Sequence, residues 1–181
     1  MARIDLLKKK IDAYLRKEQL LKNQEHTKLE KPFLKKARKN FAVARLMFVI
    51  SEQEELKKVL ALASEFETYE WVIIVSYYSM YVSALAALAR LGFKSKSHAA
   101  TIAVLEHYYI HQQKNLEAKH LHQLAKAYTL SEDLITKLIQ TKIRRETAQY
   151  DATPAISREV AVSALEDAEE FMTKIEETLI V

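Results

Sequence analysis

The sequence contains no cysteine, and its 181 residues include one glycine and two prolines. Without cysteine the chain cannot form disulfides, thiolate zinc sites or a cysteine nucleophile. Folds built on tight turns need many residues that reach positive φ or fix a turn, and this chain lacks them. One glycine also cannot build a glycine-rich phosphate loop or a dinucleotide-binding fingerprint. Because hydrophobic residues make up 49% of the chain, a core can form, and the composition predicts an all-α domain.

Apolar residues recur at helical spacing in several segments, and this periodicity predicts where the helices lie. We expect helices over 3–23, from about 32 to 50, from 51 over a short segment, over 69–91, over 98–111, over 115–128, from 131 to about 150, and from 157 to the end of the chain. Ser51 and Glu54 form a capping-box pattern that predicts the start of the short helix. Gly92 follows the longest apolar helix, where a left-handed residue is needed to end it.

The polar segment 23–32 predicts a linker, because it ends in Pro32 and interrupts the helical pattern. We therefore expect two units: a helical N-terminal extension with its linker over residues 1–31, and a helical bundle over residues 32–181. His26 lies in the linker, and we expect its side chain to be solvated.

The most apolar stretch, WVIIVSYYSMYVSALAALA at 71–89, is about long enough to cross a bilayer. It carries three serines and three tyrosines and lies among amphipathic helices, so we interpret it as the buried central helix of a bundle. Its tyrosines, with Tyr108 and Tyr109, are expected in the core or in a dimer interface. The charged N-terminus lacks the apolar core of a signal peptide, and we expect a cytoplasmic protein.

Charge is unevenly distributed along the chain. Residues 1–50 carry 14 Lys/Arg against 5 Asp/Glu, a net charge of +9, and the rest of the chain carries a net charge of −5. A basic half of this kind can meet nucleic acid or an acidic partner, and the alternative is an ordinary solvated helix face. His107 and His111 share a helix face, but no third ligand lies near them, and we expect no metal site and no cofactor.

Polar residues of several kinds gather in IRRETAQYDATP at 143–154. Arg145 lies on the polar side of a helix expected to end before Pro154, and Tyr150 is close enough to face the same cleft. A guanidinium binds phosphate through two hydrogen bonds, whereas a phenol with a pKa of about 10 is a poor general base at neutral pH. The alternative is that Arg145 pairs with a carboxylate of the last helix and that Tyr150 packs there.

Four stretches of the chain share their pattern and order with one known family. They are FLKKARKNFAVARLMF (33–48), VSYYSMYVSALAALARLGFKSKSHAATIAVLEHYYI (75–110), RRETAQYD (144–151) and ALEDAEEFMTKIEETL (164–179). Together they resemble the HEPN domain family (higher eukaryotes and prokaryotes nucleotide-binding), specifically the small stand-alone branch encoded beside minimal nucleotidyltransferases. The resemblance covers roughly residues 33–180.

This resemblance implies an antiparallel up-and-down helical bundle that pairs as a homodimer. Many relatives are metal-independent ribonucleases that use an arginine and a histidine with four to six residues between them, and some are toxins neutralised by the nucleotidyltransferase. Arg145 matches the arginine of this pattern, and Tyr150 matches the signature tyrosine of the branch. The sequence departs from the nuclease pattern because no histidine follows Arg145 in that window, while His98 matches a Lys-Ser-His block on another helix.

We therefore expect a dimeric module that binds a nucleotide or RNA, or a minimal nucleotidyltransferase partner in a toxin–antitoxin-like pair. The candidate binding residues are Arg144, Arg145, Tyr150 and His98, and catalysis, if retained, would fall on Arg145 and Tyr150. The first alternative is a metal-independent ribonuclease toxin in which Arg145 works with a displaced base such as His98. The second alternative is a purely structural helical protein.

Overall fold

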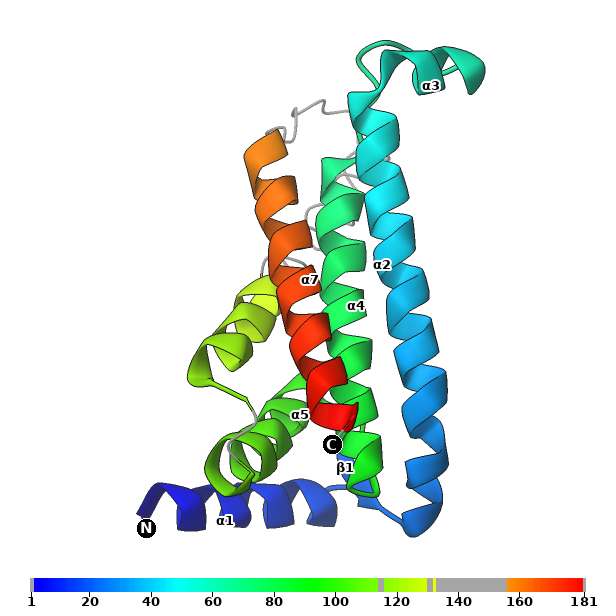
Figure 1. Ribbon diagram of the computed structural model, residues 1–181. Helices are drawn as coiled ribbons and strands as arrows, with labels where there is room; N and C mark the ends of the chain where they lie inside the picture. Colours follow the sequence, from blue (N-terminus) through cyan, green and yellow to red (C-terminus); the bar gives the residue numbers. More distant parts are fainter. Residues whose placement is uncertain (1, 114–115, 130–131, 133–155, 181) are drawn as a thin grey trace, which may run out of the picture.

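Three long helices form the main layer of the molecule (Figure 1). They are α2 (Glu30–Glu52), α4 (Tyr69–Arg90) and α7 (Arg158–Ile180). The structure is a computed structural model, and it describes residues 2–113, 116–129, 132 and 156–180. Helix α2 runs antiparallel to α4 and α7, which run in the same direction, and the short α3 (Glu54–Val59) projects from the end of α2. The predicted all-α bundle is confirmed.

Helix α4 is the central element because most of its side chains are apolar and small enough to pack on every side. Fifteen of its residues are buried, and they include all four of its alanines and all three of its serines. The hydroxyl groups of Ser79 and Ser83 donate to carbonyl oxygens of their own helix. Because these hydroxyl groups are hydrogen-bonded, burying them costs little folding free energy. By length and composition α4 is apolar enough to span a membrane, but 78% of its most apolar window is buried in the bundle. Helix α4 is therefore the core helix of this bundle.

Two polar contacts join the ends of the three long helices. At one end, the Glu52 carboxylate accepts hydrogen bonds from the Tyr69 hydroxyl and the Arg158 Nε, each at 2.7 Å. At the other end, the Arg90 guanidinium donates to both carboxylate oxygens of Glu30 at 3.0 Å and to the carbonyl of Leu179 at 2.5 Å. Each contact therefore joins α2, α4 and α7, and we call them the Glu52 contact and the Arg90 contact.

The N-terminal segment differs from the predicted helix and linker. Helix α1 (Ala2–Arg16) ends early, and Glu18 adopts a left-handed φ of 54°. The chain then forms β1 (Leu20–Lys22), which pairs antiparallel with β2 (Phe93–Ser95) and so makes a small sheet that the sequence did not predict. The expected linker is largely a 3₁₀ helix, η1 (Gln24–Leu29). Because Leu20 is fully buried, this segment is part of the core packing.

Gly92 ends α4 with a φ of +78°, which confirms its predicted role. Its carbonyl accepts a hydrogen bond from the Asn23 amide at 2.9 Å, and a Cβ at this position would lie 3.2 Å from the Asn23 carbonyl oxygen. The His26 Nδ1 also lies 3.2 Å from the Gly92 carbonyl oxygen, so the prediction of a solvated His26 is wrong. The glycine is thus where the N-terminal segment meets the main bundle.

Ser51 does not cap α3, because α2 continues past it to Glu52. The Ser51 side chain is buried, donates to the Met47 carbonyl and accepts from the Thr68 amide at the start of α4. The expected capping residue instead fixes the connection between α2 and α4.

The remaining helices pack on another side of α4. Helix α5 (His98–Leu105) is capped by Ser97, whose hydroxyl accepts from the Ala100 amide, and it continues as the π-helix η2 (Glu106–Gln112). A further helix covers residues 118–129. Helix α1 crosses beneath α5 and η2 (Figure 1), and Leu7 and Ile11 place its apolar side in the main core.

Candidate functional site

Of the four residues predicted to form the site, the structure describes one. Arg144, Arg145 and Tyr150 lie outside the described residues, so their predicted convergence stays a prediction. His98 is described, and the site can be built from it.

His98 is the first residue of α5, and it lies in a group of aromatic rings. Its imidazole stacks on Tyr128 of the helix 118–129, with ring centroids 4.0 Å apart and an interplanar angle of 14°. Tyr81 and Tyr77 of α4 lie 6.0 and 6.1 Å from the imidazole, measured between ring centroids. The Ser97 cap fixes the start of α5, and this directs the imidazole toward α4 and the neighbouring helix.

The environment of His98 keeps its imidazole neutral. Burial lowers the pKa of His98 to about 4, because the charged form loses its hydration. Both ring nitrogens are buried and have no hydrogen-bond partner among the described residues. A neutral imidazole has one donor and one acceptor, so His98 brings two unused polar atoms to this place.

Tyr77 and Tyr81 beside His98 are also neutral. Burial raises the pKa of Tyr77 far above its ordinary value and raises that of Tyr81. Tyr77 is buried, whereas Tyr78, the next residue, is 43% exposed, and its ring is tilted by 52° against the Tyr77 ring, with ring centroids 5.2 Å apart. The expectation of core tyrosines therefore holds for Tyr77 and Tyr109, and Tyr78 faces solvent.

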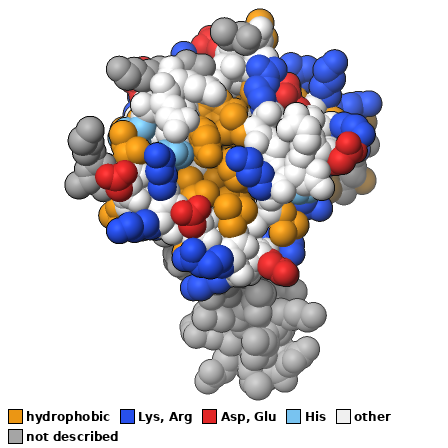
Figure 2. Space-filling view, turned by 90° about the horizontal axis from the view of Figure 1, so that it is seen from below, with side chains coloured by type: hydrophobic (Ala, Val, Ile, Leu, Met, Phe, Trp, Pro, Cys, Tyr) orange, Lys and Arg blue, Asp and Glu red, His pale blue; other side chains and the backbone are white. Residues whose placement is uncertain are grey.

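A groove of about 320 Å³ opens beside His98. Its walls come from α1, with Lys10 and Tyr14, from α5, from the start of η2, with Glu106, and from the helix 118–129, with Tyr128. Seen from below, this end of the molecule shows a hydrophobic centre surrounded by Lys and Arg side chains, with several Asp and Glu side chains among them (Figure 2). An arrangement of rings beside a lysine suits a planar ligand that carries a negative group.

Sequence reasoning missed Lys10, Tyr14 and Tyr128. They belong to two segments, α1 and the helix 118–129, that are distant in the sequence from each other and from His98, and each segment by itself is an ordinary amphipathic helix. Only the folded arrangement places them next to His98, so no linear pattern could have identified them.

The other predicted histidines have structural surroundings. His107 is 2% exposed within η2, and its Nε2 lies 3.1 Å from the Gln112 Nε2. His111 Nε2 lies 3.7 Å from a carboxylate oxygen of Glu106. His120 is also 2% exposed, and its Nδ1 accepts from the Glu117 amide at 3.0 Å. These three histidines are parts of helix packing, and His107 Nδ1 and His111 Nε2 have no hydrogen-bond partner among the described residues.

The family model of the HEPN domain matches residues 54–178. The chain belongs to the HEPN domain family. The matched range contains α4, α5 with His98, the helix 118–129 and nearly all of α7. It leaves out α1 and α2, although α2 packs along α4, so the match begins later than the resemblance at 33–48 suggested. No curated protein matches the chain.

Proposed function

We propose that this HEPN-domain protein is a cytoplasmic binding module that holds a nucleotide or single-stranded RNA and assembles with itself and with a minimal nucleotidyltransferase. Family membership supports the general class. The observation that supports this class of ligand is the stacking of His98 on Tyr128 at the edge of the groove, which Lys10 also lines. Arg144, Arg145 and Tyr150 would complete the site from the helix predicted around them.

The groove offers the two contacts that single-stranded nucleic acid needs. Aromatic side chains can stack with bases, and each such contact contributes about 1–3 kcal/mol. The exposed Lys10 can meet a phosphate, as can Lys8 and Lys9, which are exposed on the same helix. Glu106 also lines the groove, and its negative charge would repel a phosphate beside it. We therefore propose that the anionic end of the ligand lies toward the lysines of α1.

A ribonuclease role for His98 has less support. A general base works best with a pKa near the operating pH, and the pKa of His98 is lowered to about 4. An imidazole this weakly basic would take a proton from a 2′-hydroxyl poorly. The ribonuclease toxin therefore stays the alternative, with Arg145 as its first candidate residue.

Binding is tested with a fluorescein-labelled single-stranded RNA oligonucleotide, with fluorescence anisotropy as the measurement. We expect His98→Ala and Lys10→Ala to weaken binding about fivefold or more each, since stacking and phosphate contacts are lost. His122→Ala is the matched control, because His122 is exposed on the helix 118–129 and does not line the groove. No measurable RNA or nucleotide binding by the wild type would overturn the proposed ligand.

Incubation of the same oligonucleotide with the purified protein separates binding from cleavage. The binding module predicts intact RNA. Cleavage that disappears in Arg145→Ala would establish the ribonuclease alternative instead.

Self-association has support from two exposed aromatic residues on α4. Trp71 is 48% exposed and Tyr78 is 43% exposed, and a spacing of seven residues places both on one helix face. We expect light scattering to show a dimer that Trp71→Glu converts to monomer, whereas Val59→Glu, on the projecting α3, leaves it unchanged. A wild-type monomer at micromolar concentration would contradict this part of the proposal.

The nucleotidyltransferase partner is tested through the neighbouring gene. If that gene encodes a minimal nucleotidyltransferase, co-expression should yield a stable complex with this chain. Growth arrest by this chain alone, relieved by the partner, would support the toxin–antitoxin-like pair.

A further inference from the structure

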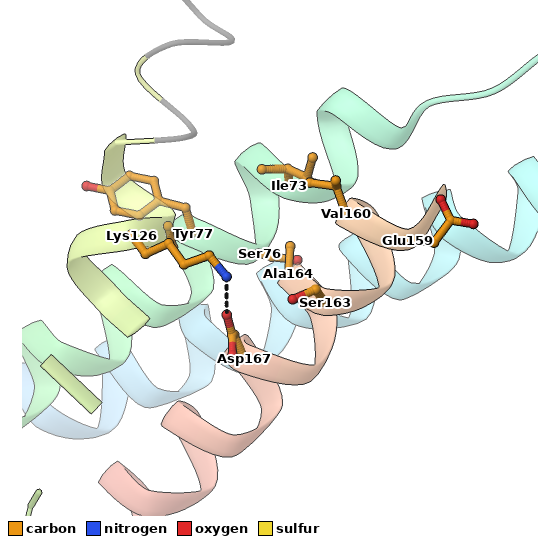
Figure 3. A pocket seen from close by; sticks show the side chains of 10 residues that line it. Ile73, Ser76, Tyr77, Lys126, Glu159, Val160, Ser163, Ala164 and Asp167 are labelled. Atoms are coloured by element: carbon orange, nitrogen blue, oxygen red, sulfur yellow. Dashed lines mark ion pairs between the residues drawn. The ribbon is translucent and has the colours of Figure 1, made fainter. Parts of the chain in front are cut away.

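A second cavity, of about 260 Å³, lies between α4, the helix 118–129 and α7 (Figure 3). It is distinct from the groove beside His98, although Tyr77 contacts His98 and also lines this cavity. Its walls are mostly apolar and include Ile73, Val160 and Ala164. A cavity of this size is slightly below the range of about 300–1,000 Å³ that is usual for drug-sized ligands, so it suits a smaller molecule.

One buried polar atom in this cavity lacks a partner. Ser76 is 1% exposed, and its hydroxyl has no hydrogen-bond partner within the part of the chain that the structure describes. Two other buried serines of α4 behave differently: Ser79 donates to the Val75 carbonyl and Ser83 to the Met80 carbonyl, each at 2.8 Å. An unpaired buried hydroxyl costs about 1–3 kcal/mol. A ligand in the cavity can supply the missing hydrogen bond.

The charged groups around the cavity favour a cation. Glu159 and Asp167 carry two negative charges on α7, and Lys126 carries one positive charge on the facing helix. Lys126 Nζ lies 3.8 Å from Asp167 Oδ2, and the lysine side chain is 61% exposed, so this ion pair is weak and can open (Figure 3). The Tyr77 ring adds a surface on which a cation can be placed.

We propose that this cavity binds a small organic amine, with its apolar body between α4 and α7, its polar group near Ser76 and its positive charge near Asp167 or Glu159. The apolar walls select a compact aromatic or alkyl body. The excess negative charge disfavours a carboxylate of the same shape. This site does not depend on the proposed nucleic-acid function.

Three probes of nearly the same shape test the preference: 2-phenylethylamine, 2-phenylethanol and phenylacetate, titrated into the full-length protein by isothermal titration calorimetry. We expect the amine to bind tightest, about two- to fivefold tighter than the alcohol, because partly exposed ion pairs are weak. Phenylacetate should bind most weakly. The proposal is overturned if no probe binds at millimolar concentration, or if phenylacetate binds best.

Matched variants locate the site. Ala164→Leu should fill the cavity and abolish binding, and Asp167→Asn should reduce the preference for the amine over the alcohol. Glu166→Gln removes the same charge from a neighbouring exposed position of α7 that does not line the cavity, and binding should stay unchanged. Equal amine binding in Ala164→Leu and the wild type would place the ligand elsewhere and overturn the assignment.

Thermal unfolding without ligand tests the role of Ser76 independently. Ser76→Ala should keep or raise the melting temperature, because it removes an unpaired buried hydroxyl, and it should weaken amine binding about three- to tenfold. Ser79→Ala, which removes a paired hydroxyl, should not raise the melting temperature. If Ser76→Ala lowers the melting temperature as a paired serine would, Ser76 has an internal partner and the proposal fails.

Discussion

The two sides of α4 are stabilised in different ways. Toward α2 and α7, apolar packing is closed at both ends by the Glu52 contact and the Arg90 contact, whose polar atoms are paired across three helices. Toward α1, α5 and the helix 118–129, aromatic rings dominate, and the His98 nitrogens and the Ser76 hydroxyl lack partners among the described residues. The comparison indicates where ligands can act: paired polar groups fix the frame, and unpaired buried groups leave hydrogen bonds for a ligand to make.

The largest expected difference between the two sides is in stability. Phe171 on α7 is fully buried, so Phe171→Ala should lower the free energy of unfolding by about 3–5 kcal/mol. Tyr128→Ala on the other side should cost about 1–2 kcal/mol, because Tyr128 is half-buried and contributes mainly ring contacts. Urea unfolding followed by circular dichroism measures both, and equal losses would contradict the comparison.

The next effect concerns pH and the aromatic side. The folded state keeps His98 neutral down to about pH 4, whereas the unfolded chain protonates it near its ordinary value of 6.5. The contribution of neutral His98 to the free energy of unfolding is therefore fully present above pH 6.5. It is lost as the pH falls from 6.5 toward 4, and the loss is about 3 kcal/mol at most. His98→Phe should therefore flatten the stability curve in this window. A curve for His98→Phe that runs parallel to the wild type would show that the burial of His98 is unimportant.

The Arg90 contact should have a smaller effect. Arg90→Ala removes a two-point hydrogen bond to Glu30 and one to the Leu179 carbonyl, and we expect a loss of roughly 1–2 kcal/mol after allowance for partial exposure. Arg38→Ala is the control, because Arg38 is 64% exposed and pairs with Glu176 at the surface. We expect a loss of about 0–1 kcal/mol there. If both variants lose a similar free energy of unfolding, the Arg90 contact does not stabilise the arrangement of the three long helices more than a surface ion pair does.

The smallest expected effect is the pH response of the Glu52 contact. The hydrogen bonds from Tyr69 and Arg158 hold the pKa of Glu52 below its ordinary value of 4.5. A carboxyl with a lowered pKa stabilises the fold above its unfolded pKa, and this stability is lost as the pH falls through the folded pKa. Glu52→Gln should therefore be less stable than the wild type at pH 7, with the difference narrowing below pH 4.5. An unchanged difference down to pH 3 would contradict this cause.

Much of the frame could be predicted from the sequence. The apolar run around Tyr77 required a central helix, and Gly92 had to end it because no other residue there tolerates a left-handed φ so readily. Ser51 shows the limit of this reasoning, because its local pattern fits a cap and a distant contact with Thr68 decided its role.

The site was less predictable. His98 was identified from a family pattern, but its stack on Tyr128 joins residues 30 positions apart, and Lys10 comes from a helix expected to be a separate extension. The predicted contribution of Arg145 and Tyr150 stays a prediction, since both lie outside the described residues.

The sequence by itself determined that this chain is helical, that α4 is its core and that α4 ends at Gly92, because periodicity, burial and backbone conformation are properties of short segments. The tertiary structure decided which polar groups are paired, where the two cavities lie, and that the N-terminal segment joins the bundle through β1 and β2. These features depend on contacts between residues far apart in the chain, and local sequence patterns carry no information about such distances.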